Sequence, residues 1–115
     1  MNQTFPREPS GITWFVSRHS GAIEWAKCQG LAIVRWVGHL DPNSVAAEDT
    51  VIGTLPVNLA AEVCKRGARY LHLSIAVPAP WRGRELSVGD LLMLGASLEP
   101  YRIEHGTQGL RREPA

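Results

Sequence analysis

The sequence has few cysteines and almost no net charge, and both shortages exclude classes of protein. Cys28 and Cys64 are the only cysteines among 115 residues, they lack the CxxC spacing, and the four histidines show no zinc-ligand spacing. A formal net charge of +1 provides no strongly basic surface, so we expect no DNA partner. The sequence therefore predicts reduced, packed thiols and no metal or other cofactor.

Long apolar runs are also missing. The longest uncharged stretches, residues 50–61 and 70–81, are interrupted by proline and are shorter than the about 20 apolar residues of a membrane-spanning helix. The polar start of the chain, which contains Arg7 and Glu8, shows no signal-peptide pattern. These features predict a cytoplasmic protein that does not bind membranes.

Length and composition predict one domain. A chain of 115 residues with 44% apolar residues has enough material for a single core. Residues 1–11 and 105–115 are mostly polar and contain proline or glycine. We therefore expect a flexible leader, a single domain at residues 12–104 and a flexible tail.

Strand and helix patterns alternate along this domain. Apolar and β-branched residues predict strands at 12–17, 31–40, 50–55 and 70–77, with a candidate edge strand at 101–104. Helical spacing predicts helices at 21–29, at 56–67 and after Ser87, which forms a capping-box pattern with Asp90. This order predicts an α/β fold, with a mostly parallel sheet of four to five strands and helices on both faces.

The turn Ser17-Arg18-His19-Ser20-Gly21 joins the first predicted strand to the first predicted helix, with Ser20 as the expected N-cap. Free amides at a helix start, the positive end of the helix dipole and two cationic side chains favour a bound anion there. If the next two strands flank the first one on opposite sides, this turn faces Gly53-Thr54-Leu55-Pro56-Val57-Asn58 across a ligand crevice. Glycine permits close approach, and hydrogen bonds to a sugar or base would come from Ser17, Thr54 and Asn58.

Three blocks of the chain carry a family resemblance. They are WFVSRHSGAIEW from Trp14, His39-Leu40-Asp41, and GTLPVNLAAEVC from Gly53 with Gly67 and Tyr70-Leu71-His72-Leu73 behind it. Together they resemble a small CRISPR-associated family, the Csx-sixteen or VVA type. The resemblance covers about residues 13–104 and departs from the family pattern at residues 81–95 and at Pro100.

The resemblance implies a Rossmann-like domain, related to the CARF sensors of type III CRISPR defence, with ring nuclease activity. Such an enzyme cleaves cyclic oligoadenylate, here expected to be cyclic tetra-adenylate, and so switches off the antiviral signal. The 2′-hydroxyl beside each phosphate is the nucleophile, so cleavage needs no metal and leaves linear products with a 2′,3′-cyclic phosphate.

For this reaction we expect Arg18 to bind the phosphate oxygens, because a guanidinium can hold two of them, and His19 to act as acid or base. The residues expected to bind the ligand are Ser17, Ser20, Gly21, His39, Gly53, Thr54, Leu55, Pro56 and Asn58. A domain of this size cannot surround the ring, so we expect a homodimer with a shared pocket.

Other interpretations of these residues stay open. Arg18 could pair with Glu24, His19 could be an ordinary helix-terminus residue, and His39 and His72 could be structural. Trp81 is a candidate for stacking on an adenine, and residues 82–85 are either solvated rim or a lid.

Two further hypotheses compete with the ring nuclease. The first is a non-catalytic module that senses or sequesters cyclic oligoadenylate. The second is an unrelated mononucleotide-binding enzyme, although neither a GxGxxG nor a P-loop pattern is present.

Overall fold

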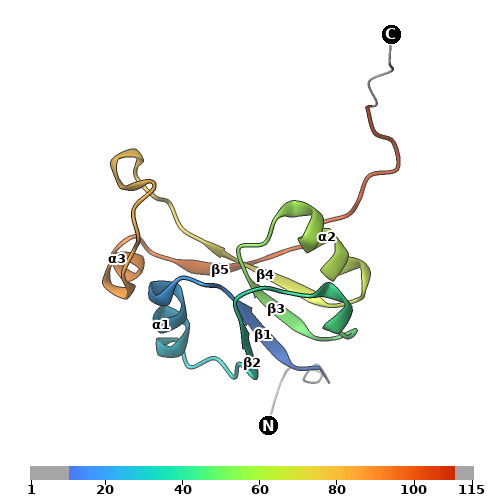
Figure 1. Ribbon diagram of the computed structural model, residues 1–115, viewed down its shortest axis with the longest axis horizontal. Helices are drawn as coiled ribbons and strands as arrows, with labels where there is room; N and C mark the ends of the chain where they lie inside the picture. Colours follow the sequence, from blue (N-terminus) through green and yellow to red (C-terminus); the bar gives the residue numbers. More distant parts are fainter. Residues whose placement is uncertain (1–10, 111–115) are drawn as a thin grey trace.

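The computed structural model describes residues 11–110, so most of the predicted leader and part of the tail lie outside the described residues (Figure 1). In chain order the elements are β1 (Thr13–Val16), α1 (Ser20–Cys28), β2 (Arg35–Val37), the 3₁₀ turn η1 (Pro42–Ser44), β3 (Thr50–Gly53), α2 (Val57–Lys65), β4 (Arg69–Ser74), the 3₁₀ turn η2 (Ala79–Trp81), α3 (Val88–Met93) and β5 (Ser97–Tyr101).

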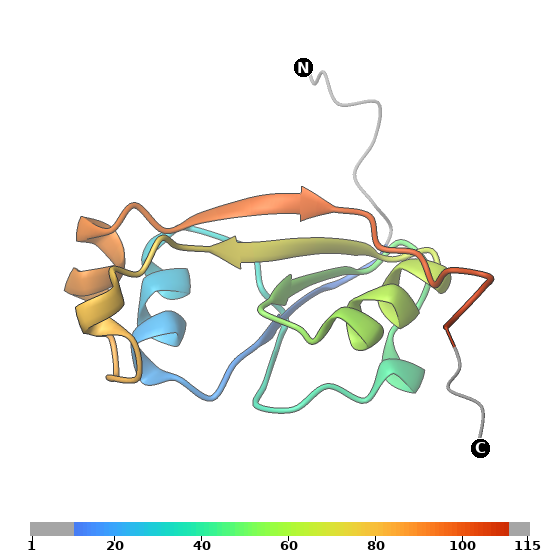
Figure 2. The same cartoon turned by 90° about the horizontal axis from the view of Figure 1, so that it is seen from above.

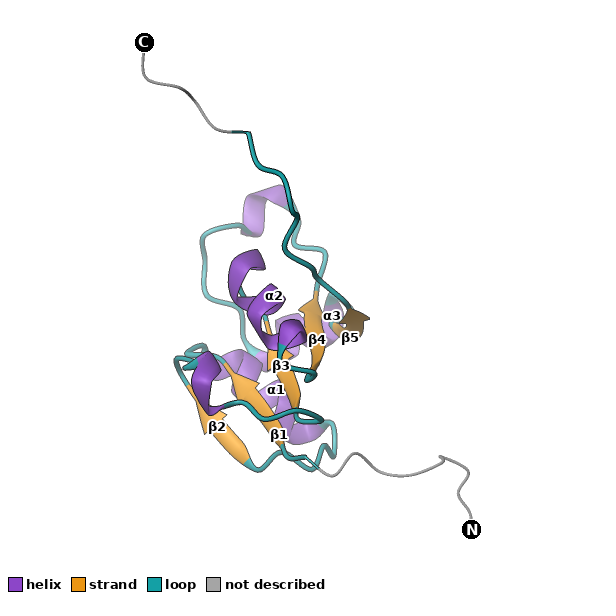
Figure 3. Ribbon diagram, turned by 90° about the vertical axis from the view of Figure 1, so that its right-hand side faces the viewer, coloured by secondary structure: helices purple, strands orange, loops and turns teal. Residues whose placement is uncertain are grey.

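The strands form one sheet in the order β2-β1-β3-β4-β5, which confirms the predicted α/β class. The strands β1 to β4 are parallel to their neighbours, whereas β5 runs antiparallel to β4. The two edges of the sheet are β2 and β5 (Figure 3). Since β2 and β3 lie on opposite sides of β1, the carboxyl ends of these three strands meet at the predicted switch point.

Neighbouring residues of the central strands pack on opposite faces of the sheet, because side chains alternate along a strand. One face contains a buried cluster with α2, and it includes Trp14, Val51, Ala60, Val63 and Tyr70. The other contains a cluster with α1 and α3, and it includes Phe15, Trp25, Ile52, Leu73 and Leu91. Figures 1 and 2 show α1 and α3 side by side and away from α2. Helices therefore pack on both faces of the sheet, as the sequence predicted.

The predictions were wrong at the sheet edges. The second strand was expected at residues 31–40, but β2 has only three residues, and Val34 joins β1 through one backbone hydrogen bond of 2.9 Å to Thr13. The last strand was expected at residues 101–104, but β5 is Ser97–Tyr101. It pairs with Ser74 to Tyr70 of β4 and includes Pro100, which an edge strand tolerates because its outer side needs no donor.

The expected helix cap was also wrong. His19, not Ser20, is the N-cap of α1, with extended backbone angles of −93° and 119°. The Ser17 hydroxyl oxygen accepts a hydrogen bond of 3.0 Å from the His19 amide. Because the His19 amide is bonded within the turn, His19 is the last residue before the helix, and Ser20 is the first residue in it.

The thiols also differ from the prediction in part. Cys64 is partly buried and its sulfur accepts a hydrogen bond of 3.4 Å from the Ile103 amide, whereas Cys28 is exposed. Cys28 is the last residue of α1, beyond the part of the helix whose residues Trp25 and Ala26 pack on the sheet. Cys28 therefore lies outside the core, whereas the sequence predicted that it would be packed there.

Gly21 lies where α1 meets the segment before α3. A Cβ atom at this position would overlap the Leu86 carbonyl oxygen, so we expect Gly21→Ala to lower the free energy of unfolding by about 1–3 kcal/mol. Gly89→Ala in α3 is the matched control, because its Cβ would meet only the Ser87 hydroxyl at 3.7 Å. This variant should raise the free energy of unfolding by about 0.5–1 kcal/mol, because alanine has a higher helix propensity than glycine. Urea denaturation measures both, and equal effects would contradict the predicted contact.

Candidate functional site

A cavity of about 950 Å³ opens at the carboxyl ends of β1, β2 and β3. Its walls come from the turn after β1, the segment after β2, the turn after β3 and residues 83–86. Ligands of open α/β sheets bind at this kind of position, and the volume lies near the upper end of the usual range for ligand pockets. The cavity is therefore the candidate functional site.

Most of the predicted site residues line this cavity. Those brought together there are Ser17, Arg18, His19, His39, Gly53, Thr54, Leu55 and Pro56. The predicted residues outside the lining are Ser20, Gly21 and Asn58. Ser20 and Asn58 are exposed residues in the first turns of α1 and α2, and the close approach that Gly21 allows is to Leu86 within the fold.

Arg18 extends beside the end of β2. A Cβ atom on Gly38 would lie 2.8 Å from Arg18 Cγ, so glycine leaves the room that this side chain occupies. Within residues 11–110, Arg18 has neither an ion pair nor a hydrogen bond, which excludes the alternative pairing with Glu24 in this structure. Its guanidinium N–H groups are therefore free to bind an anion at the cavity.

His19 follows Arg18 at the start of α1. Its carbonyl oxygen accepts the hydrogen bond of 3.1 Å from the Ile23 amide that opens the helix, and its exposed imidazole lines the cavity. No hydrogen bond to the described part of the chain orients this ring. The turn thus presents a guanidinium and an imidazole from consecutive residues to one cavity.

The turn after β3 is held by Tyr70 of β4, which the sequence had not indicated as part of the site. The Tyr70 hydroxyl oxygen accepts a hydrogen bond of 2.9 Å from the Leu55 amide and lies 3.2 Å from the Gly53 carbonyl oxygen. It also lies 2.7 Å from His72 Nδ1. Burial raises the pKa of the Tyr70 hydroxyl, which therefore keeps its proton.

His72 belongs to this network but does not line the cavity. Its ring contacts the edge of the Tyr101 ring, with centroids 5.7 Å apart, and it is not among the lining residues. The structure thus agrees with the structural interpretation of His72. By contrast, His39 is exposed at the cavity wall.

The segment before α3 supplies a wall whose role the sequence had left open. Gly83, Arg84, Glu85 and Leu86 all line the cavity. Glu85 is the only acid among the lining residues, whereas Arg18 and Arg84 are both basic, so the cavity has a net positive charge with neutral histidines. Trp81 lines only a smaller neighbouring hollow of about 410 Å³, which Arg84 also lines, and the Arg84 guanidinium lies over the Trp81 ring.

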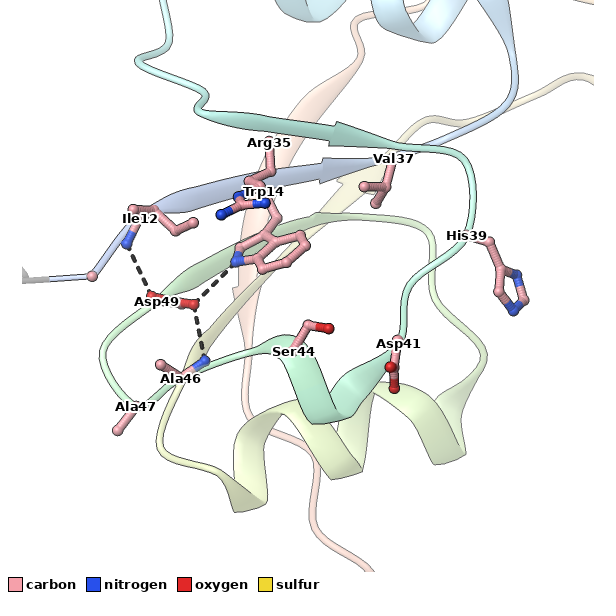
Figure 4. Close-up of a pocket in the computed structure, with 11 residues that line it drawn as sticks. Ile12, Trp14, Arg35, Val37, His39, Asp41, Ser44, Ala46, Ala47 and Asp49 are labelled. Carbon is pink, nitrogen blue, oxygen red and sulfur yellow. Dashed lines mark hydrogen bonds between the residues drawn. The ribbon is translucent and has the colours of Figure 1, made fainter.

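A second hollow, of about 720 Å³, lies on the α2 side of β1 and β2 (Figure 4). The Arg35 guanidinium lies 5.6 Å from the centre of the Trp14 ring within it. His39 lines both hollows, but Figure 4 shows its ring pointing away from Trp14 and Arg35. The two hollows therefore adjoin at the segment that follows β2.

Asp49 is the buried carboxylate of this second hollow, with an exposed fraction of 4%. One oxygen accepts a hydrogen bond of 2.9 Å from the Ile12 amide, and the other accepts from Trp14 Nε1 at 3.0 Å and from the Ala46 amide at 2.9 Å (Figure 4). Burial alone would raise the pKa of Asp49, but these hydrogen bonds outweigh it and lower the pKa. Asp49 therefore joins three segments of the fold rather than acting as an acid or base.

The described residues form neither a metal-binding cluster nor a membrane-spanning helix. From Gly11 to Leu110, no three histidine, cysteine or acidic side chains are arranged to hold a metal ion. In the same part of the chain, no helix has the length and apolarity needed to span a bilayer.

Comparison with known proteins identifies a family and no individual relative. Residues 14–104 match the family described as "Putative CRISPR-associated protein (Cas_VVA1548)". No curated protein and no solved structure gives a significant match to the chain. The matched range includes every residue that lines the cavity.

Proposed function

Because the chain belongs to the Cas_VVA1548 family of CRISPR-associated proteins, we propose that it is a ring nuclease that cleaves cyclic tetra-adenylate and ends type III CRISPR signalling. One observation carries the proposal. Arg18 and His19 line the same switch-point cavity, and neither side chain has an ion pair or hydrogen bond within residues 11–110. A cation and a titratable ring are thus available where a phosphate would bind.

The proposed reaction is an internal transesterification. A ribose 2′-oxygen attacks the adjacent phosphorus in line, the bond from phosphorus to the 5′-oxygen breaks, and a 2′,3′-cyclic phosphate forms. Arg18 stabilises the charge that develops on the non-bridging oxygens, and the free amides at the start of α1 add to this field. His19 delivers a proton to the leaving 5′-oxygen or removes one from the 2′-hydroxyl, either of which is worth about 10²–10⁴-fold in rate.

The ring is proposed to bind between two copies of the chain. The side chains of Arg18, His19, His39 and Thr54 are exposed at the cavity, which leaves them accessible to a ligand shared with a second copy. A two-fold axis would bring one Arg18–His19 pair from each copy to a pseudo-symmetric ligand. Analytical ultracentrifugation with the ligand should then give one ring for every two chains.

A sensor or sequestering module is the second candidate function. It is favoured by the His19 imidazole, because no hydrogen bond to residues 11–110 orients the ring as a catalytic base usually requires. A module of this kind would bind cyclic tetra-adenylate tightly and release it intact.

Turnover in EDTA separates the two candidates. We expect the purified protein to convert cyclic tetra-adenylate to linear products with EDTA present, as detected by mass spectrometry. His19→Ala should slow this cleavage by about 100-fold or more and leave the dissociation constant nearly unchanged, because it removes proton transfer and spares the phosphate contacts. Recovery of intact ring after long incubation with the wild type would count against the nuclease.

The control is His105→Ala. His105 is exposed and lies outside the cavity lining, so this variant makes the same chemical change away from the site. It should cleave at the wild-type rate. An equal loss in the two variants would contradict the proposed role of His19.

A further inference from the structure

Residues 81–84 form a tight turn that folds Arg84 back over Trp81. Arg82 has backbone angles of −69° and 141°, and Gly83 has a φ of 86°, which are close to those of a type II turn. The Arg84 amide donates a hydrogen bond of 3.4 Å to the Trp81 carbonyl oxygen. Gly83 stands at the position that requires a positive φ, so the sequence Trp-Arg-Gly-Arg itself favours this turn.

The turn places the Arg84 guanidinium on the Trp81 ring, 4.2 Å from its centre. A cation over a ring face is attracted by the ring electrons and not through a hydrogen bond, so this contact needs none of the guanidinium N–H groups. No ion pair or hydrogen bond from residues 11–110 occupies these donors. Trp81 therefore holds a cation in place without using its hydrogen-bonding capacity.

Arg84 and Arg18 line the same cavity from different walls. Arg18 comes from the turn after β1, whereas Arg84 belongs to the segment before α3. The contact between Gly21 and the Leu86 carbonyl joins these two walls beside α1. Two arginines from separate walls therefore line one cavity of about 950 Å³, and Arg84 also lines the smaller hollow beside Trp81.

We propose that Arg84 is a second phosphate-binding residue of this cavity, so that the site takes a ligand with at least two phosphodiester groups. The identity of that ligand rests on the proposed function, whereas the second phosphate contact rests on the geometry of residues 81–86. One phosphate would lie at Arg18 and another at Arg84. Trp81 is then a positioning residue, because it acts through the Arg84 side chain that it supports.

The first test measures binding of cyclic tetra-adenylate in the His19→Ala background, where cleavage is expected to be about 100-fold slower and the ring survives the binding measurement. Adding Arg84→Ala should weaken binding by about 10- to 100-fold, as expected for the loss of a charge-assisted hydrogen bond. It should also reduce the slope of log affinity against log salt concentration by about 0.7, the value for one single-stranded phosphate. Trp81→Leu should weaken binding less than Arg84→Ala does.

The matched control is Arg82→Ala. Arg82 lies in the same turn and carries the same charge, but it lines only the smaller hollow. This variant should bind within about three-fold of its parent and keep the parent's salt slope. Equal losses for Arg82→Ala and Arg84→Ala would overturn the proposal, because they would indicate a general charge effect.

A second arm uses inorganic tripolyphosphate, compared with sodium chloride at equal ionic strength, and follows the thermal unfolding midpoint of the full chain. Tripolyphosphate should raise the midpoint of the wild type and of Arg82→Ala by more than that of Arg84→Ala, which keeps only the phosphate contact at Arg18. If the shift caused by tripolyphosphate depends on Arg84 but cyclic tetra-adenylate does not bind, the second phosphate site is supported and the proposed function is wrong. If neither probe depends on Arg84, the proposal is overturned even when the wild type cleaves the ring.

Discussion

Replacing Arg18 by alanine will slow cleavage of cyclic tetra-adenylate by about 10²–10³-fold, the usual cost of removing a group that stabilises transition-state charge. A guanidinium can hold two phosphate oxygens at once, and the N–H groups of Arg18 have no competing partner within residues 11–110. Single-turnover measurements with enzyme in excess isolate this effect from substrate binding.

Arg18→Lys tests whether geometry matters besides charge. Lysine keeps the positive charge but presents a point charge instead of a planar fork, so it should recover only part of the lost rate. Arg102→Ala is the control, since Arg102 is exposed and lies outside the cavity. If Arg18→Ala cleaves the ring at a rate within three-fold of the wild-type rate, the proposed role of Arg18 is wrong.

Replacing Asp49 by alanine will lower the free energy of unfolding by about 3–5 kcal/mol, the largest stability loss that we expect for this chain. The reason is that it leaves three donors without their acceptor, namely the amides of Ile12 and Ala46 and the Trp14 indole. Asp49→Asn should lower the free energy of unfolding by less than Asp49→Ala does, because the asparagine side chain keeps one acceptor oxygen. Urea denaturation at neutral pH measures both variants.

Asp41→Ala provides the control for Asp49. Asp41 is exposed and accepts a hydrogen bond of 3.0 Å from the Asn43 amide at the start of η1. Losing this cap should cost about 1 kcal/mol. A similar loss at Asp49 would mean that its three hydrogen bonds contribute little to stability.

The contribution of Asp49 should also depend on pH. Burial tends to raise the pKa of its carboxyl group, but the hydrogen bonds hold that pKa below the ordinary value of 3.8. The unfolded chain therefore takes up the proton first as the pH falls, and stability is lost between the ordinary pKa and the lower pKa of the folded state. The difference between wild type and Asp49→Ala should be constant above about pH 5 and shrink below about pH 4. A difference that stays constant down to pH 3 would contradict this linkage.

Several elements could be predicted because their signals are local. The capping box at the start of α3 is present as expected, since the Ser87 hydroxyl accepts from the Asp90 amide at 3.1 Å and the Asp90 carboxylate accepts from the Ser87 amide at 3.0 Å. The buried strands β1, β3 and β4 lie within their predicted ranges or one residue beyond them. The edge strands were less predictable, because the length of an edge strand depends on how many residues its one neighbour pairs with.

The candidate site was predictable where it follows from strand order. The turns after β1 and β3 meet because parallel strands end at the same edge of the sheet, so Arg18, His19 and Thr54 could be placed together in advance. Tyr70 and Asp49 were missed because each bonds to residues far away in the sequence. Asp49 and Trp14 are 35 residues apart, and only the acidic residue directly before a buried strand hinted at such a contact.

Amino-acid order alone was sufficient for the alternation of strands and helices, the α/β class and the cationic turn after the first strand, because each depends on residues within a few positions of one another. Only the assembled sheet decided which walls enclose the cavity, that Arg84 shares it with Arg18, and that Gly21 contacts Leu86. Those outcomes depend on contacts between segments distant in the chain, whose geometry is set by packing on both faces of the sheet rather than by local preference.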